Sequence, residues 1–480
     1  MNRIHIILLL TMLAAGSCAT AQYTPVKVNV SNDIVRNEYG EFLVHKVQPR
    51  ETLFSISKAY SVNVNNIKKD NPSVANGLKT GDILLIRTGD AAMLAEDPAI
   101  VEPDEKRKNK DVEETSVFIP LKPDADHVHN ISLIIPADSK NFSATSAGNN
   151  FLDFYHGFLI AMNDAKEAGI SMRIEVIDNK EYQGSSQIVY SGRLDRSDLI
   201  IGPVFASEIE GILPFANERE IPVISPMDPS ANKFIEGNHN FLQISVDDTN
   251  QQKSLLSCIP VDAHVAVFFE KGGRDEKMLE VTRNFLTESG IDYKSISYGL
   301  LEGRSVRDLL QKQLDAGREN HVVVVSSSEA FVSDVLRNLN LINSRNGYKV
   351  TLYGLPRWRN FESVDVNYYH SMNLHLAMQY YVDYSREDVK RFLARYRALF
   401  GSEPTPYSFQ AYDIGKYFSE RLSRYGRRFI DNIEDYYPER LLQSDFKFVR
   451  KSSGSGLSNC GTRIVVYRPD YSVELLTPFR

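Results

Sequence analysis

The apolar residues between Phe42 and Thr88 predict a small unit made of strand, helix, helix and strand. The letters FLVHKV alternate in the manner of a half-buried strand, and DILLIR returns as a second strand. Between them, apolar residues recur at helical spacing from Leu53 and again from Val64. A unit of about fifty residues has little core to stabilise it, so its apolar side chains should be buried together. These side chains are Leu53, Ile56, Tyr60, Ile67, Leu84 and Ile86.

From residue 130 to residue 480, predicted strands and helices alternate. Nearly continuous runs of Ile, Val and Leu, such as ISLIIPA, SDLIIGP and IPVISP, are separated by helical segments. This pattern is typical of a parallel sheet that is covered on both faces. The same rhythm restarts after residues 248–252 with HVAVFFE and HVVVVSS. The sequence therefore predicts an α/β domain of two lobes, with the lobe change near residues 248–252.

Residues 90–129 break both patterns. The stretch EDPAIVEPDEKRKNKDVEET is dominated by charge and proline. Such a composition cannot bury enough apolar surface to offset the entropy of the chain, so we expect a flexible, partly extended linker. At about 3.3 Å per residue, about forty extended residues span more than about 100 Å. The folded parts on its two sides are expected to move independently.

The first residues have the layout of a secretory signal. One arginine precedes a short apolar run, and small residues follow in AAGSCATA. We predict an exported protein of the periplasm or cell envelope, with residues 1–21 as signal peptide and 22–41 as a lead segment. The favoured interpretation is cleavage after Ala21, and the alternative is a lipoprotein signal with Cys18 acylated. No later segment approaches the roughly 20 apolar residues needed to cross a bilayer, so any membrane contact would pass through Cys18 or a partner.

Composition narrows the function further. At 480 residues and 54.4 kDa the chain should hold about two to four domains. Its 42% hydrophobic and 24% charged residues are typical of a globular protein, and a net charge of -7 offers no basic field to collect phosphates. Nucleic acid is therefore not an expected partner. Beyond the signal, spacing leaves open whether Cys258 and Cys460 form a disulfide or are two separate buried thiols.

The small unit, taken as residues 42–89, resembles a LysM module, the domain that binds glycans containing N-acetylglucosamine, such as peptidoglycan and chitin. The matches run through the whole unit, and their ordered series is more specific than any single one. In chain order they are His45 and Val47, Glu51 to Leu53, Ile56 and Ser57, Tyr60 and Val62, Ile67, Asn71 and Pro72, Gly77 to Lys79, Gly81, Leu84 and Ile86.

In that family the glycan lies in a shallow groove between the loop before the first helix and the loop after the second. The resemblance implies that backbone groups there bond the acetamido groups while apolar side chains support the sugar faces. Arg50 and Ser61 stand where the family often has glycine. A spacer domain without useful affinity is the alternative. The residues implied in glycan binding are Arg50, Glu51, Thr52, Leu53, Phe54, Asn71, Pro72, Asn76, Gly77 and Leu78.

Residues 130–480 resemble the type I periplasmic-binding fold of amino-acid receptors of the Leu/Ile/Val class. The matching stretches include FYHGFLIAMNDA, EVIDN, LIIGPVFASEI, IPVISPMDPS and FLQISVDDTNQ. The resemblance implies a ligand cleft between the lobes, at the carboxyl ends of the strands, where helix N-termini present free N–H groups to an anion. The implied cleft residues are Ser207, Ser225, Met227, Asp228 and Ser230.

Two residues of that cleft differ from an amino-acid clamp. Pro229 lacks an N–H donor, and Asp228 adds a negative charge where the ligand carboxylate is expected. In the second lobe no motif marks the acidic residue that would hold an amino group. The open candidates there are Glu270, Asp275 and Glu329.

The sequence contains no signature of catalysis. It has no His-Glu-x-x-His, Gly-x-Ser-x-Gly, phosphate loop or Cys-x-x-Cys motif, so we expect no enzyme activity and no cofactor. His127 and His129 have the spacing of metal ligands, but two histidines in a linker are more often solvated, and we expect no metal site. A wall hydrolase is a minor alternative, which rests only on the frequent pairing of LysM modules with such enzymes.

These features predict a non-enzymatic bacterial cell-envelope protein that docks on peptidoglycan through its LysM-like unit. The two-lobed domain would bind a small molecule in its cleft or contact an envelope protein partner. Wall attachment, together with Asp228 and Pro229 in the expected ligand clamp, favours an envelope protein partner over a small molecule. Such a partner would point to the regulation of wall synthesis. A wall-tethered solute receptor for an amino acid or similar small molecule is the alternative.

Overall fold

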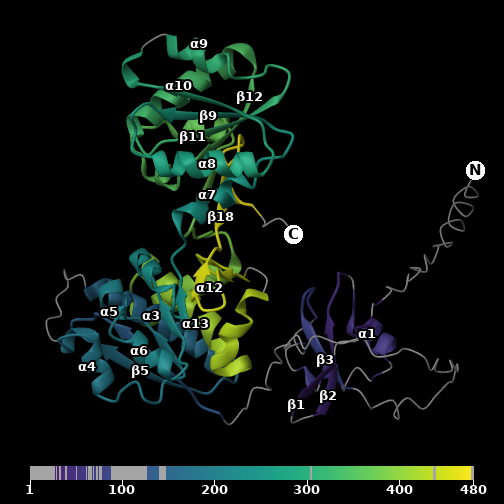
Figure 1. The fold of residues 1–480 in the computed structure, drawn as a ribbon, viewed down its shortest axis with the longest axis vertical. Coiled ribbons are helices and arrows are strands. Elements are labelled where there is room, and N and C mark those ends of the chain that lie inside the picture. Colours follow the sequence, from purple (N-terminus) through teal and green to yellow (C-terminus); the bar gives the residue numbers. More distant parts are fainter. Residues whose placement is uncertain are drawn as a thin grey trace, which may run out of the picture. The chain divides into compact units, whose positions relative to one another are not determined.

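The computed structural model divides into two units, Met1–Ile119 and Pro120–Arg480 (Figure 1). The predicted signal peptide, Cys18 and most of the predicted linker lie outside the described residues. The structure describes residues 28, 30–31, 34–37, 40–49, 51–60, 62, 67–68, 70–71, 74, 78–87, 127–139, 148–302, 305–435 and 439–476.

The first unit is an antiparallel sheet of strand order β1-β2-β3 with a helix between its last two strands. This arrangement confirms the predicted strand, helix, helix and strand. It also adds β1, which lies in the segment predicted only as a lead segment. The elements are β1 (Ile34–Asn37), β2 (Gly40–Lys46), α1 (Leu53–Tyr60), helical backbone at residues 67–68 and 70, and β3 (Ile83–Arg87).

The predicted apolar residues form the core of this unit. Ile56, Ile67, Leu84 and Ile86 are at most 1% exposed. Leu53 and Tyr60 are half-buried against the same cluster, at its edge. The core is completed by Val47, Val62 and Val74, and it is also contacted by Val28, Leu43 and Leu78.

The second unit contains two largely parallel sheets, as expected for an α/β fold. The first has strand order β16-β17-β8-β7-β6-β4-β5, parallel except where β16 pairs with β17. Its strands are β4 (His129–Ile135), β5 (Met172–Asp178), β6 (Leu199–Ile201), β7 (Val223–Ser225), β8 (Phe241–Gln243), β16 (Phe448–Arg450) and β17 (Leu457–Asn459). The helices of this lobe are α3 (Gly148–Glu167), α4 (Ser185–Tyr190), α5 (Ala206–Ile209), α6 (Leu213–Glu218), α12 (Glu387–Phe400) and α13 (Pro406–Tyr425), with the short turns η4 (Asn179–Glu181), η5 (Pro229–Phe234), η8 (Gly426–Asp431) and η9 (Ile433–Asp435).

Two long helices of the first lobe, α3 and α13, pack backbone to backbone although they lie far apart in the sequence. A Cβ atom added to Gly157 would lie 1.9 Å from the carbonyl oxygen of Ser408, and one added to Gly415 would lie 2.8 Å from the Cβ atom of Ala161. Glycine at these positions permits the close approach. The C-terminal part of the chain is thereby locked onto the start of the domain.

The second sheet has strand order β10-β9-β11-β12-β13-β18-β19, and only its β18 and β19 pairings are antiparallel. Val322 and Val324 of β11 face the cluster of α9 and α10, whereas Val323 and Val325 face that of α7 and α8. Figure 1 shows α10 and α8 on either side of β9 and β11. The elements are α7 (Asp248–Leu256), β9 (His264–Glu270), α8 (Glu276–Glu288), β10 (Tyr293–Tyr298), η6 (Leu300–Glu302), α9 (Ser305–Gln311), β11 (Glu319–Val325), α10 (Glu329–Asn346), β12 (Lys349–Gly354), η7 (Pro356–Asn360), α11 (Val366–Ser371), β13 (His375–Met378), β18 (Arg463–Tyr467) and β19 (Val473–Leu475).

The chain passes from one sheet to the other after β8, after β13 and after β17. Residues 439–476 therefore supply strands to both lobes, together with the short pair β14 (Glu439–Arg440) and β15 (Asp445–Phe446). Sequence analysis did not predict this return. Among the described residues, no helix is long and apolar enough to cross a membrane.

A buried ionic cluster of Asp413, Asp445 and Arg463, called here the crossing network, lies at the last passage between the sheets. The Arg463 side chain is 0% exposed, and its Nε atom donates to Asp445 at 2.9 Å. Its terminal nitrogens donate to four backbone carbonyls, including those of Leu441 and Leu442. Asp413 accepts the backbone N–H groups of residues 442, 443 and 444 at 2.8 to 3.0 Å. The Asp413 and Arg463 side chains thus both fix the backbone of residues 441–444.

Candidate functional site

In the small unit, the loop before α1 is held by a buried clasp of His45, Glu51 and Tyr60. The Glu51 carboxylate bonds to His45 Nε2 and accepts the Gln48 backbone N–H, both at 2.8 Å. The other ring nitrogen of His45 lies 2.9 Å from the Tyr60 hydroxyl. His45 is 2% exposed and Glu51 is 8% exposed, so water does not weaken these bonds. The family resemblance implied that Glu51 lies on the glycan surface, but it did not indicate that Glu51 fixes this loop.

The next residues combine a polar edge with an apolar side chain. The Ser55 N–H donates to the Thr52 hydroxyl at 3.1 Å, and the Thr52 N–H donates to Ser55 Oγ at 2.8 Å. This is a capping box with serine in place of the usual acid, and it fixes the start of α1. Thr52 is exposed, and Leu53 beside it is half-buried. Such a surface suits a neutral ligand with both hydroxyl groups and apolar faces.

Asn71 joins the second helical segment to β3. Its amide nitrogen donates to the carbonyl oxygens of Ile67 and Leu85, and its amide oxygen accepts the Leu85 N–H, each at 2.8 Å. Asn71 is 6% exposed. Leu78 is half-buried against the core beyond this loop. The Asn71 amide therefore bonds within the fold at three positions, which the sequence motif did not indicate.

In the first lobe, Asp228 occupies the N-terminus of α5. One carboxylate oxygen accepts the Ala206 N–H at 2.8 Å, and the other accepts the N–H and hydroxyl of Ser230 at 2.9 and 2.5 Å. Burial opposes ionisation of Asp228, but these hydrogen bonds outweigh it and hold its pKa below the ordinary value. The Asp228 carboxylate, which belongs to the chain itself, therefore already accepts the backbone N–H of Ala206 after β6.

The other predicted cleft residues surround Asp228 without forming one open surface. Ser225 is fully buried, and its hydroxyl has no partner among the described residues. The Met227 carbonyl accepts the Ser245 hydroxyl at 2.7 Å, which fixes the loop after β7. Ser207 is exposed and lies beside a separate pocket of the first lobe. The prediction that these residues bind a ligand stays a prediction.

The acidic candidates of the second lobe have different surroundings. Asp275 accepts the N–H and hydroxyl of Ser327 at 2.7 and 2.9 Å, and Glu329 accepts those of Ser363 at 2.5 and 2.7 Å. Both carboxylates therefore fix loops of their own lobe. Glu270 lines a hollow of about 390 Å³ together with Asp275.

Cys258 and Cys460 are free, half-buried thiols in the structure. Burial raises the pKa of Cys258 to about 11, so its reactive thiolate is scarce at neutral pH. Cys460 accepts a weak hydrogen bond from the Asn250 amide at 3.7 Å, and burial raises its pKa as well. Neither environment favours a nucleophile.

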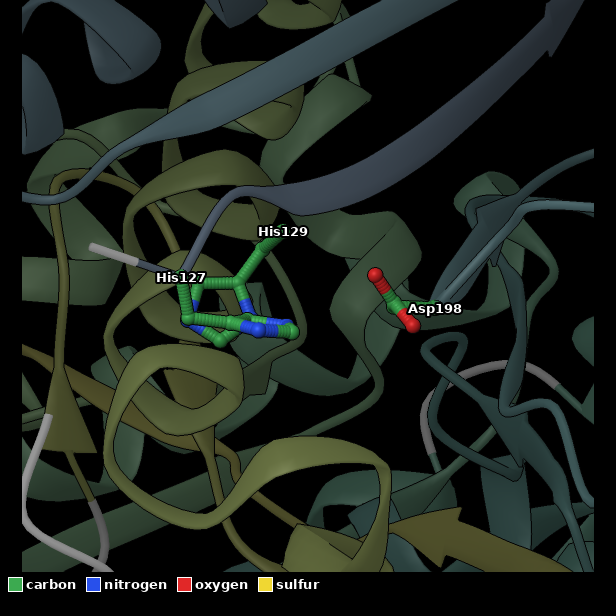
Figure 2. Close-up of side chains that lie close together, drawn as sticks. All are labelled: His127, His129 and Asp198. Atoms are coloured by element: carbon green, nitrogen blue, oxygen red, sulfur yellow. The ribbon is translucent and has the colours of Figure 1, made fainter. Parts of the chain in front are cut away.

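His127, His129 and Asp198 lie close together at the start of β4, with ligand atoms within 4.8 Å of one another (Figure 2). Asp198 is already engaged, because Arg427 bonds one of its oxygens at 2.9 Å and the Asn130 N–H bonds the other at 2.8 Å. Burial raises the pKa of Asp198, but these hydrogen bonds and the Arg427 charge lower it further than burial raises it. A divalent cation here would be repelled by the Arg427 guanidinium. The expectation of no metal site stays a prediction.

Comparison with known proteins identifies the small unit. The family model described as LysM domain matches residues 45–87. Residues 45–87 are a LysM domain. The comparison with curated protein sequences found no significant match. The folded clasp, the capping box and the Asn71 bonds described above are therefore internal features of this LysM domain.

The large unit has the type I periplasmic-binding fold. A Rhodospirillum rubrum structure described as a branched-chain amino acid ABC transporter is 13% identical, covers 73% of this chain and 100% of its own, and superposes with a TM-score of 0.52. Another, a Rhodopseudomonas palustris ABC-type branched-chain amino acid transporter, is 11% identical with a TM-score of 0.46 and covers 73% and 95% of the two chains. A substrate-binding protein of Desulfitobacterium hafniense in complex with Leu is 14% identical, covers 73% and 100%, and has a TM-score of 0.42. The likeness to the Rhodospirillum rubrum structure, at 13% identity, supports the fold and not the ligand.

The structure describes part of the predicted glycan surface of the LysM domain. Glu51, Thr52, Leu53, Asn71 and Leu78 are described, and their contact with glycan stays a prediction. The remaining predicted contacts fall outside the described residues, and these are Arg50, the Phe54 side chain, Pro72, Asn76 and Gly77.

Proposed function

We propose that this protein is a non-enzymatic component of the bacterial cell envelope that binds peptidoglycan through its LysM domain and presents the two-lobed domain to an envelope protein partner, thereby regulating wall synthesis. The observation that carries the first half is the LysM match to residues 45–87. Both domain kinds are non-catalytic, and both suit an extracytoplasmic protein. Export through residues 1–21, with cleavage after Ala21 or with acylation of Cys18, belongs to the same proposal.

The placement of Asp228 supports a protein partner over an amino-acid ligand. A free amino acid would bring its carboxylate to helix N–H groups at the carboxyl end of the sheet. The Asp228 carboxylate already accepts the Ala206 N–H there. A second carboxylate would be repelled by the first and would find this donor occupied. Asp228 therefore already occupies one of the N–H donors that an amino-acid clamp would use.

The predicted linker supports the division of work between the domains. Residues 90–129 have the composition of an extended tether. Attaching the LysM domain to the wall would hold the two-lobed domain within the reach of that tether and raise its effective concentration there. The two-lobed domain would then bind a partner located at the wall more often, although its intrinsic affinity for that partner is unchanged.

The decisive experiment is co-sedimentation with insoluble peptidoglycan. The chain from Gln22 is expected to sediment, and a chain that starts at Pro120 is expected to remain in the supernatant, with about a tenfold or larger difference in apparent affinity. Oligomers of N-acetylglucosamine should release the longer chain by competition. If both chains sedimented equally, wall docking through the LysM domain would be excluded.

A second prediction separates the partner hypothesis from the solute receptor. A ligand that binds only the native state raises the free energy of unfolding by about 2.7 kcal/mol when its concentration is 100 times its Kd. We expect leucine at millimolar concentration to leave the melting temperature of the wild-type chain within about 1 °C of its starting value. In Asp228→Ala, the freed N–H groups should make the domain sensitive to carboxylates such as acetate and leucine.

The Asp228→Asn variant is the matched control, because it keeps the side-chain oxygen that caps α5 and should stay insensitive to carboxylates. Differential scanning calorimetry of the three chains measures the effect. A rise of several degrees for the wild type with leucine would favour the solute-receptor alternative.

A further inference from the structure

The first lobe contains a further pocket, and all the residues that line it belong to that lobe. It lies at the carboxyl ends of β5 and β6, between the segment from Asn179 to Tyr190 and the segment from Ser207 to Phe215. Its volume is about 850 Å³, within the range of small-molecule sites. The lining of this Asn179–Glu208 pocket includes Ser207 of the predicted cleft residues, but not Ser225 or Asp228.

The lining of the pocket contains buried polar groups whose hydrogen bonding is incomplete. Asn179 is 7% exposed, and neither its amide nitrogen nor its amide oxygen meets a partner at hydrogen-bonding geometry among the described residues. Glu208 Oε2 is also buried without such a partner, although the Asn179 amide and Lys180 lie near this carboxyl. Buried polar groups are rarely left unpaired, because the loss of hydration is not repaid. A ligand with hydrogen-bond donors and acceptors would satisfy the remaining hydrogen-bonding groups of Asn179 and Glu208.

The charges of the lining indicate an uncharged ligand. Glu208 and Glu210 line the pocket together with one cationic residue, Lys180, whose Nζ atom lies 3.9 Å from Glu208 Oε1. A phosphate or carboxylate would therefore meet net negative charge. Burial raises the pKa of Glu208, and Lys180 only partly opposes this rise.

Aromatic rings border the same pocket. Tyr190 at the end of α4 lines the pocket, and its side chain is 87% exposed. Phe215 lies half-buried on the opposite segment. An amide and a carboxyl group that bond adjacent hydroxyls, with a ring that covers an apolar C–H face, are the groups that recognise a pyranose.

We propose that the Asn179–Glu208 pocket binds an uncharged sugar, with Asn179 and Glu208 bonding its hydroxyl or acetamido groups and Tyr190 covering one ring face. This site does not depend on glycan binding by the LysM domain. It gives the two-lobed domain a sugar ligand of its own, held by one lobe. The same chemistry fits a wall-derived N-acetylated sugar and a free neutral hexose.

The test is saturation-transfer NMR and titration on the chain from Gln22, with N-acetylglucosamine and glucose as separate probes. Tyr190→Ala should raise the Kd of the bound sugar about tenfold or more, because the exposed ring packs only against ligand. Asn179→Ala should also raise the Kd about tenfold or more. If the Asn179→Ala chain does not fold, Tyr190→Ala alone tests the pocket. The control is Tyr384→Ala, since Tyr384 is 61% exposed elsewhere in the domain and should leave the Kd unchanged.

The two probes separate the sources of the ligand. Preference for N-acetylglucosamine would assign the pocket to wall fragments, and preference for glucose would assign it to free sugars. Binding that all three variants leave unchanged would belong to the LysM domain and would overturn the proposal. The proposal would also be overturned if neither sugar bound at a concentration ten times the roughly millimolar Kd expected of a single sugar.

Discussion

Replacing Arg463 with methionine is expected to lower the free energy of unfolding of the two-lobed domain by about 3–5 kcal/mol. Methionine fills similar volume, so the loss is electrostatic. Arg463 is fully buried and bonds Asp445 and four backbone carbonyls. Without it, Asp445 and Asp413 remain in the interior without their main countercharge, and the carbonyls lose their donors. Urea denaturation followed by circular dichroism measures the change.

The loss should also depend on pH. In the wild-type chain, burial raises the pKa of Asp413 to about 6, while Arg463 and three backbone N–H groups oppose that rise. Removing Arg463 raises the folded-state pKa further above the unfolded value. A carboxyl group with a raised folded pKa binds protons more tightly in the folded state, so stability is present at lower pH and is lost as the pH rises through that pKa. Arg463→Met should therefore be less destabilised at pH 5.5 than at pH 8.

Arg337→Met is the matched control for this prediction. Arg337 pairs with Asp334 at 2.6 Å, but its side chain is 63% exposed. An exposed pair contributes about 0–1 kcal/mol, because water already solvates both charges. Equal losses in the two variants would mean that the crossing network does not hold the passage between the lobes.

Replacing Asn71 with alanine is expected to unfold the LysM domain and abolish its binding to peptidoglycan. The Asn71 side chain supplies both partners of the Leu85 backbone and one partner of Ile67. Its loss leaves buried N–H and C=O groups unpaired, at about 1–3 kcal/mol each. A domain of about fifty residues has only a few kcal/mol of stability to lose. Limited proteolysis and peptidoglycan co-sedimentation of the chain from Gln22 report the two effects together.

Gln48→Ala provides the control within the same domain. The Gln48 side chain is exposed and makes one weak bond to the Lys46 carbonyl at 3.2 Å. It should change neither protease resistance nor sedimentation. An Asn71→Ala chain that stays resistant to protease but no longer sediments would instead assign Asn71 to the glycan surface, as the family resemblance implies.

The organisation of the chain was readable from local pattern. Helical spacing from Leu53 and the returning strand at residues 82–87 predicted the LysM core, and nearly continuous apolar strands predicted the parallel sheets. These signals are local, because the period of apolar residues follows from the backbone geometry of each element. The strand β1 was missed because IVRN lacks an extended alternation and is defined mainly by its pairing with β2. The strands after residue 439 were missed because their partners belong to sheets formed much earlier in the chain.

The sequence by itself determined which modules this protein contains, in which order, and what residue types their loops carry. Only the tertiary structure decided which polar side chains are already used. Asp228 bonds a backbone 22 positions away, and Asn71 bonds one 14 positions away, whereas Asn179 lines a pocket beside Glu208. The physical reason is that a hydrogen bond depends on distance and angle in space, and spacing along the chain does not set either across a fold.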